Sequence, residues 1–175
     1  MALSSGSIAF TGFNADGNDN IAFVALVDIA VGETIVFEDN EWTGSAWTDT
    51  NENAFAWTAT SLVPAGTIVR LDNVGVTTTP LVASTGTVAF VVGRGTGRGI
   101  NGTDEVLYAY QGSAAAPTFL AAVTNGNFNV AANGLLTGTG LSVGVTALDL
   151  GALDSGADIA AYVGPRTGLA SFGDY

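Results

Sequence analysis

Oxygen-bearing side chains gather at two places early in the chain, and their types are those that bind hard cations. The first group lies in a polar loop and comprises Asp16, Asn18, Asp19 and Asn20. The second group ends an apolar run and comprises Glu38, Asp39, Asn40 and Glu41. Calcium takes several oxygen ligands from carboxylates, amides and backbone carbonyls within one shell. Both groups are therefore candidate Ca²⁺ sites.

The same residues also have a simpler interpretation. The spacing of the first group is not that of an EF-hand, because the sixth position counted from Asp16 is Ile21 and the twelfth is Val27. Asn, Asp and Gly reverse the chain readily, since they tolerate positive φ or bond to their own backbone. The sequence leaves a calcium site and plain turn chemistry both open.

Three tryptophans, Trp42, Trp47 and Trp57, lie among Asp and Asn residues. An indole ring beside polar side chains is suited to stacking against a sugar, which makes these residues candidate glycan ligands. Large aromatic side chains also close the core of a sandwich, because each buries about 150–250 Å². The sequence leaves this alternative open as well.

Several kinds of catalysis lack their usual residues. The chain has no His, no Cys and no Lys, so a Ser or Thr nucleophile would lack its common base. A glycosidase needs two carboxyl groups of unlike pKa beside a cleft. Carboxylates are available for this at Glu38, Asp39, Glu41, Asp49 and Glu52, but a solvated acidic rim accounts for them equally well. We predict that the protein is not an enzyme.

The charge balance points to cations as partners. Sixteen carboxylates face four cationic residues, which gives a net charge of −12. Nucleic acid binding needs clustered cations that neutralise phosphates, so we expect no nucleic acid partner. The chain also contains no long uninterrupted apolar run, so we expect no membrane-spanning helix.

The stretch that carries both acidic groups reads as three strands joined by turns. Residues 8–13 alternate in polarity, residues 21–27 are apolar at nearly every position, and residues 33–38 alternate again. Period-two alternation is typical of half-buried strands, and an apolar run is typical of a strand covered on both faces. The acidic groups are therefore expected at the ends of strands.

The remainder of the chain repeats this plan. Further strands are expected at residues 53–60, 67–72, 85–93, 104–110, 145–150 and 159–163, whereas residues 119–123 fit a strand or a helical turn. Short strands at this spacing, without a capped helix, favour an all-β fold. We predict a single antiparallel β-sandwich of about ten short strands, Ig-like or jelly-roll-like, over residues 8–175, preceded by a tail at residues 1–7.

A glycine-rich segment, Gly93 to Asn101, is a further candidate for ligand binding because such loops can cradle phosphate. It lacks the Gly-Lys-Ser/Thr ending of phosphate-binding loops, and no amphipathic helix follows it. We therefore interpret it as a surface loop.

Three segments together resemble a known family: IAFTGFNADGNDNIAFVALVDIAVGETIVFEDNEW, EVLYAYQGSAAAPTFLAAV and ADIAAYVGPRTG. They are similar to bacterial extracellular domains distantly related to the lamin-tail immunoglobulin-like sandwich, over Ile8 to about Gly168. The resemblance implies a β-sandwich and an extracellular or cell-surface location. It implies no catalytic residues.

The composition favours self-association. Only 11% of residues are charged, and the chain lacks the Lys residues that commonly protect sheet edges. We expect exposed edges to pair between copies, with a short uncharged tail completing a neighbour's sheet. The candidate donor residues are Met1, Ala2, Leu3, Ser4 and Ser5.

The sequence thus predicts an extracellular structural protein that forms filaments or a surface array, with Ca²⁺ relieving its negative charge. The alternative is a monomeric carbohydrate-binding or adhesive module on the cell surface. Glycans are partners only in the second case.

Overall fold

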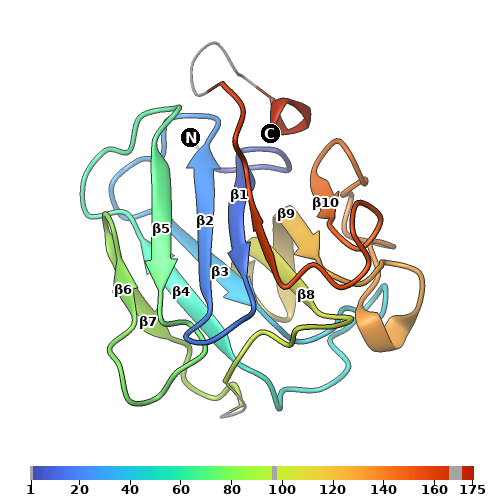
Figure 1. Cartoon of the computed structure of the whole chain (residues 1–175). Coiled ribbons are helices and arrows are strands. Elements are labelled where there is room, and N and C mark those ends of the chain that lie inside the picture. The colour runs from blue at the N-terminus through green and yellow to red at the C-terminus, as the bar shows by residue number, and fades with distance from the viewer. Residues whose placement is uncertain (1, 96–97, 166–170) are drawn as a thin grey trace.

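The computed structural model describes residues 2–95, 98–165 and 171–175, and in them two β-sheets face each other (Figure 1). The five-stranded sheet has the order β11-β1-β2-β5-β6 and the six-stranded sheet the order β10-β9-β8-β3-β4-β7. The first sheet contains β1 (Ile8–Asn14), β2 (Asn20–Ala25), β5 (Ile68–Asp72), β6 (Val82–Ala83) and β11 (Ile159–Ala161). The second contains β3 (Thr34–Glu38), β4 (Ala54–Thr58), β7 (Thr87–Phe90), β8 (Val106–Ser113), β9 (Ala116–Thr124) and β10 (Ala147–Asp149).

The all-β sandwich predicted from the sequence is confirmed. Its described helical segments are two short 3₁₀ turns, Ala131–Asn133 and Phe172–Asp174. The ambiguous segment at residues 119–123 belongs to strand β9. Two details differ from the prediction: β10 runs parallel to β9, and the two-residue strand β6 gives too short a pattern to be seen in the sequence. No described helix has the length and apolar character needed to cross a membrane.

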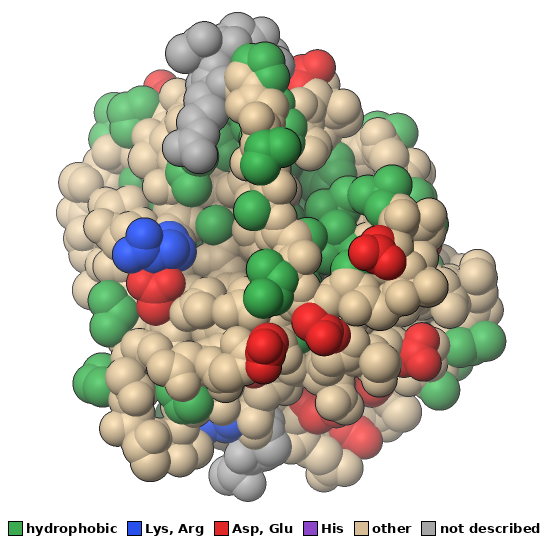
Figure 2. Space-filling model, viewed as in Figure 1, with side chains coloured by type: hydrophobic (Ala, Val, Ile, Leu, Met, Phe, Trp, Pro, Cys, Tyr) green, Lys and Arg blue, Asp and Glu red, His purple; other side chains and the backbone are tan. Residues whose placement is uncertain are grey.

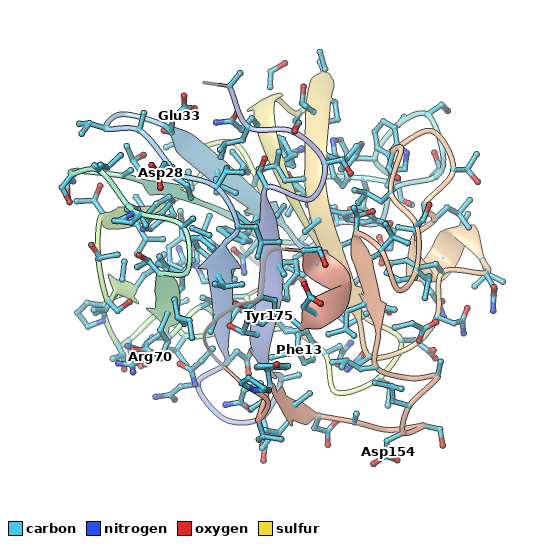
Figure 3. All side chains as sticks on the ribbon, turned by 90° about the horizontal axis from the view of Figure 1, so that it is seen from above. Phe13, Asp28, Glu33, Arg70, Asp154 and Tyr175 are labelled. Atoms are coloured by element: carbon cyan, nitrogen blue, oxygen red, sulfur yellow. The ribbon has the colours of Figure 1, made fainter. Side chains whose placement is uncertain are left out.

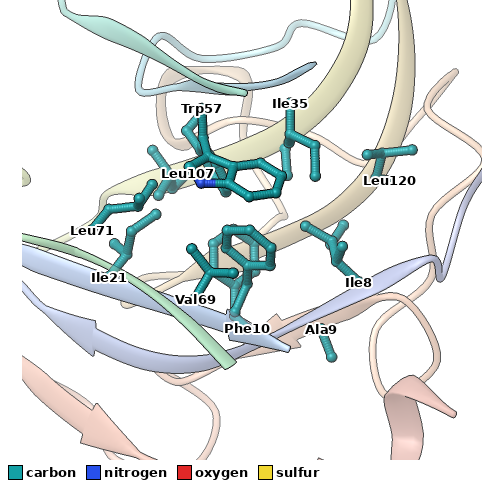
Figure 4. Close-up of a cluster of buried hydrophobic side chains, with 14 of the residues drawn as sticks. Ile8, Ala9, Phe10, Ile21, Ile35, Trp57, Val69, Leu71, Leu107 and Leu120 are labelled. Carbon is teal, nitrogen blue, oxygen red and sulfur yellow. The ribbon is translucent and has the colours of Figure 1, made fainter. Parts of the chain in front are cut away.

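The space between the sheets is filled by the inward-facing residues of each strand (Figure 4). Phe37 and Phe55 face each other across the β3–β4 pair with their rings stacked 5.4 Å apart. The Phe23 ring meets the Trp57 indole edge to face at 5.3 Å, and the indole N–H donates to the Thr85 carbonyl at 2.7 Å. A fully buried Trp57 is thereby both packed and hydrogen-bonded.

The six-stranded sheet is covered on its outer face as well. A second apolar cluster includes Trp42, Tyr108, Tyr110 and Phe119, and Leu141 packs there from the long connection before β10. This covering explains why five consecutive residues of β8, from Val106 to Tyr110, are buried instead of alternating.

The N-terminal tail is part of the folded domain. Leu3 is buried, its backbone N–H donates to the Gln111 side chain at 3.1 Å, and the N–H of Gly6 donates to the Leu120 carbonyl at 2.8 Å. Residues 2–5 therefore differ from the free donor segment expected from the sequence, because burial of Leu3 holds the tail on its own sheet. Met1 lies outside the described residues.

The outer face of the five-stranded sheet carries few charges. Figure 2 shows this face, where Arg70 lies against Asp72 and acidic side chains are more numerous in the lower half. Near the C-terminus, Phe172 is buried in the main apolar cluster and Tyr175 packs against that cluster. Figure 3 shows Tyr175 beside Phe13 in the view from above, and both line an apolar groove of about 290 Å³.

Candidate metal centre

One end of the sandwich brings together three connections that lie far apart in the sequence. They are the β1–β2 turn, the β3–β4 loop and the β7–β8 loop, all at the lower end of the molecule in Figure 1. Each connection contributes carboxylates. Antiparallel strand order causes this convergence, because every second connection of such a sheet returns to the same end.

Three glutamates form the most compact group among the described residues. The carboxylate oxygens of Glu41, Glu52 and Glu105 approach to within 4.8 Å of one another. Glu105 is buried, while Glu41 and Glu52 are partly exposed. Glu105 is fixed at the start of β8, where its backbone N–H donates to the Asn125 side chain at 2.7 Å and its carboxylate accepts the N–H of Asn101 at 3.1 Å.

Asp39 is the residue that distinguishes this cluster from a solvated acidic rim. Its side chain is 1% exposed, and neither carboxylate oxygen has a hydrogen-bond partner among the described residues. The Asp39 N–H donates to the Asn53 carbonyl at 3.1 Å, which continues the β3–β4 ladder by one residue. Asn53 is equally buried, and its Oδ1 also lacks a partner.

The alternation of strand β3 explains the direction of Asp39. Phe37 and Phe55 point into the core, and Asp39 and Asn53 lie two residues beyond them on the same face of the sheet. The β3–β4 pair therefore places a carboxylate and an amide oxygen between the sheets, at the point where apolar packing ends.

Asp19 reaches the same region from the β1–β2 turn. It adopts a φ of +48°, and its Oδ2 accepts the backbone N–H of Ile100 at 2.8 Å. A Cβ atom at Gly75 would overlap this carboxylate, so the close approach requires glycine there. Asp19 is 5% exposed, in contrast to its exposed neighbours in the turn.

The electrostatics reflect burial and mutual repulsion. Burial, reinforced by Glu105 and Glu52, raises the pKa of Asp39 well above its ordinary value. Burial, with repulsion from Glu41, raises the pKa of Glu52 to about 7, and burial, with repulsion from Glu52, raises that of Glu105 to about 8. Burial also raises the pKa values of Asp19 and Glu41. All five shifts have the same sign, because burial is the largest cause of each.

A bound cation commonly neutralises such a cluster of carboxylates. Buried charges in proteins are paired or coordinate metals, because an isolated buried carboxylate is very unfavourable. The donors here are exclusively oxygens, which suit Ca²⁺ or Mg²⁺ and disfavour thiolate- and imidazole-seeking metals. A hollow of about 260 Å³, lined by Glu52, Glu105 and Ile100 among others, lies beside the cluster.

Arg98 lines the same hollow without neutralising it. Its guanidinium lies 3.5 Å from the centroid of the Phe90 ring, and it forms no ion pair with the other described residues. The cation needed by the carboxylates is thus not supplied by this arginine.

The prediction of Glu38 as a metal ligand is wrong. Neighbouring residues of a strand point to opposite faces, so Glu38 lies on the side away from Asp39. There its carboxylate accepts bonds from Arg94 at 2.9 Å, from the Tyr110 hydroxyl at 3.1 Å and from Asn40. Its negative charge is already balanced in a buried ion pair with Arg94.

Most residues of the first predicted group form the β1–β2 turn and do not belong to the buried cluster. Asp16 and Asn18 are exposed, and the Asn18 amide donates to Asn73 at 3.3 Å. The Asn20 side chain accepts the Asn73 N–H at 3.1 Å. Of this group only Asp19 joins the buried cluster, where it interacts electrostatically with Asp39 of the second group.

The three tryptophans do not form one platform. Trp57 is fully buried between the sheets, so its predicted role in glycan stacking is wrong. Trp42 and Trp47 do lie together, with ring centroids 5.2 Å apart across an isolated bridge. Trp42 is 7% exposed, and of the three only Trp47 is partly exposed.

Three cluster residues were missed as metal ligands, namely Glu105, Asn53 and Glu52. Glu105 and Asn53 carry no individual signal, because single polar residues at strand ends are common in β proteins. A usable signal exists at the Asp104–Glu105 pair, which begins an apolar strand much as Glu38–Asp39 ends one. Glu52 was considered only as a carboxylate for catalysis.

The chain was also compared with protein-family models, curated proteins and solved structures, and it matches none of them. The resemblance to lamin-tail-like extracellular domains thus stays a prediction.

Proposed function

We propose that this protein is an extracellular structural domain whose loops are held together by one bound Ca²⁺ ion. The observation that carries the proposal is the Asp39 carboxylate, which is 1% exposed and has both oxygens unpartnered among the described residues. Four further carboxylates, those of Glu105, Glu52, Asp19 and Glu41, interact electrostatically with it. In this proposal the ligands are Asp39, Glu41, Glu52 and Glu105, with Asp19 and the Asn53 amide oxygen beside them.

Calcium fits better than magnesium on the character of the ligands. Ca²⁺ accepts six to eight oxygens in a flexible arrangement, whereas Mg²⁺ needs near-ideal octahedral geometry and gives up water reluctantly. The donors here come from separate connections and include long glutamate side chains. A site of this kind adapts its radius to the larger ion.

The proposed ion has a structural role. It would neutralise repulsion among the carboxylates and tie the β3–β4 loop to the start of β8. Catalysis is not favoured by the same geometry, because a glycosidase uses two carboxyl groups with opposed pKa values, and here all shifts are upward. An extracellular location agrees with the proposal, since calcium modules there work at about 10⁻⁴–10⁻³ M.

Isothermal titration calorimetry tests the proposal on the full chain freed of metal by chelation. We expect one Ca²⁺ per chain, with Mg²⁺ binding at least about tenfold more weakly because of its stricter geometry. Binding should release protons at pH 7, so the measured heat should vary with the ionisation enthalpy of the buffer. Absence of a saturable heat with Ca²⁺, or equal binding of Mg²⁺, would contradict the assignment.

Self-association is a second proposed function, and the edge formed by β6 and β7 supports it. β7 pairs with β4 and has no partner on its other side among the described residues. Val92 lies two residues beyond the end of β7 and is 99% exposed, and Val82 of β6 is 47% exposed. An unpaired edge without Lys is a surface on which another copy can add a strand, and heterologous contacts of this kind build filaments or arrays.

Light scattering and electron microscopy test this second function, with and without Ca²⁺. Val92→Glu places a charge beside the edge and should reduce assembly. Val31→Glu is the matched control, because Val31 is 66% exposed in the β2–β3 connection, away from that edge. A monomer at every calcium concentration, or equal effects of the two variants, would refute the edge proposal.

A further inference from the structure

A second hollow, of about 460 Å³, lies on the outer side of the six-stranded sheet. It is formed by the β3–β4 loop, by Arg94 after β7 and by the turn between β8 and β9. Its volume falls within the range of about 300–1,000 Å³ typical of small-ligand sites. Its lining includes Ser45, Trp47, Asp49, Thr50, Asn51 and Arg94.

Trp47 is the aromatic wall of this hollow, and its orientation is fixed. The indole N–H donates to the Ala114 carbonyl at 2.9 Å, and the ring packs edge to face against Trp42 at 5.2 Å and Tyr108 at 5.6 Å. Despite these contacts the side chain stays partly exposed. Because its N–H already has a partner, the exposed part of the indole that lines the hollow is available to a ligand through contact with the ring.

The polar side chains of Asp49 and Asn51 line the same hollow as Trp47 and are hydrogen-bonded to each other. The Asp49 carboxylate accepts the backbone N–H of Asn51 at 2.9 Å and its side-chain amide at 3.1 Å. Both side chains are exposed, so each keeps free hydrogen-bonding positions toward solvent. An aromatic face flanked by a carboxylate and an amide matches a pyranose ring, which has a C–H face and hydroxyl groups at its rim.

The charges select among sugars. Arg94 lies 5.9 Å from the centre of the Trp47 ring, but its charge is balanced by Glu38 at 2.9 Å. Asp49 has no ion pair among the described residues, and the chain carries a net charge of −12. A carboxylated or sulfated sugar would therefore be repelled.

We propose that the hollow beside Trp47 binds a neutral pyranose sugar, with a C–H face of the ring on the indole and hydroxyl groups on Asp49 and Asn51. This site uses none of the proposed calcium ligands. It would let the domain attach to a neutral polysaccharide.

Tryptophan fluorescence tests this proposal, because Trp42 and Trp57 are buried and Trp47 is the partly exposed indole. Neutral gluco-, galacto-, manno- and chito-oligosaccharides are titrated in turn, with oligouronates as the charged comparison. At least one neutral sugar is expected to protect Trp47 from acrylamide quenching, and oligouronates are not. If no neutral sugar protects the indole at millimolar concentration, or if oligouronates bind better, the proposal is overturned.

Variants connect binding to the hollow. Asn51→Ala and Asp49→Ala remove exposed side chains and should each weaken binding about tenfold, which corresponds to losing a hydrogen bond to a polar or charged group. Asn129→Ala is the matched control, because Asn129 is exposed and its N–H donates to Asn127 in the same kind of turn. Trp47→Phe keeps an aromatic ring in the packing and should also weaken binding. Affinity unchanged in all three hollow variants would place the sugar elsewhere and refute the assignment.

Discussion

Replacing Asp39 by Asn should change stability in opposite directions with and without calcium. In chelated protein the Asp39 carboxylate is buried without a hydrogen bond and repelled by its neighbours. An amide of the same shape removes the charge and its desolvation, so Asp39→Asn should stabilise the chelated protein by about 1–3 kcal/mol. The same change removes a charged ligand from the proposed ion.

The second expected effect of Asp39→Asn is a smaller stabilisation of the protein by calcium. With a dissociation constant of about 100 μM, in the range of extracellular calcium modules, 10 mM Ca²⁺ stabilises the native protein by about 2.7 kcal/mol. For a chain of 175 residues this corresponds to a rise in Tm of roughly 5–11 °C. If the variant binds about a hundredfold more weakly, about 0.4 kcal/mol remains, and the rise should shrink to roughly 1–2 °C.

Glu38→Gln is the matched control for this experiment, because the neighbouring residue faces the other side of the sheet. It leaves Arg94 without its carboxylate and should cost about 3 kcal/mol with or without calcium. The calcium-induced rise in Tm should stay that of the wild type. Differential scanning calorimetry of the three proteins in chelator and in Ca²⁺ checks both parts. A full calcium response in Asp39→Asn, or an equal loss in both variants, would refute the assignment of Asp39.

Three further predictions concern the same domain. Because the pKa values of Glu52 and Glu105 are raised to about 7 and about 8, the folded state binds more protons than the unfolded state above the ordinary value of 4.5. The free energy of unfolding of the chelated protein should therefore fall by a few kcal/mol as pH rises from 5 to 9, and solvent screening reduces the contribution of the partly exposed Glu52. Ca²⁺ should make this pH dependence weaker. Urea unfolding at several pH values measures the pH dependence, and stability that rises with pH would contradict the prediction. Leu3→Ala should lower the free energy of unfolding by about 2–3 kcal/mol, because the tail is packed on its own sheet. An unchanged urea midpoint would contradict this packing and support a free tail. Trp57→Ala should cost about 3–5 kcal/mol and leave calcium stoichiometry unchanged in the folded fraction, and a lost calcium site with normal stability would contradict its placement in the core.

The strands were predictable because their signals are local. Alternation over residues 33–38 follows from the burial of Ile35 and Phe37 in β3, and the apolar run near β2 ends in three consecutive buried residues. In β1 the pattern still predicted a strand, although Ile8, Ala9 and Phe10 are all buried. Strand β6 was missed because two residues carry no periodicity, and the parallel pairing of β10 depends on a long connection whose path has no local signal.

The metal centre was only partly predictable, because its members come from three connections. The two oxygen-rich groups each supplied one buried member of the cluster, Asp19 and Asp39. The pleat of β3 separated Glu38 from Asp39, which residue type alone does not reveal. Glu105 joins them only through the strand order of the six-stranded sheet.

An anomalous difference map from crystals grown with Ca²⁺ would locate the ion. The proposal predicts a single strong peak bounded by the carboxylates of Asp39, Glu52 and Glu105. A map without a peak there, or with its strongest peak beside the exposed Asp16 turn, would contradict it.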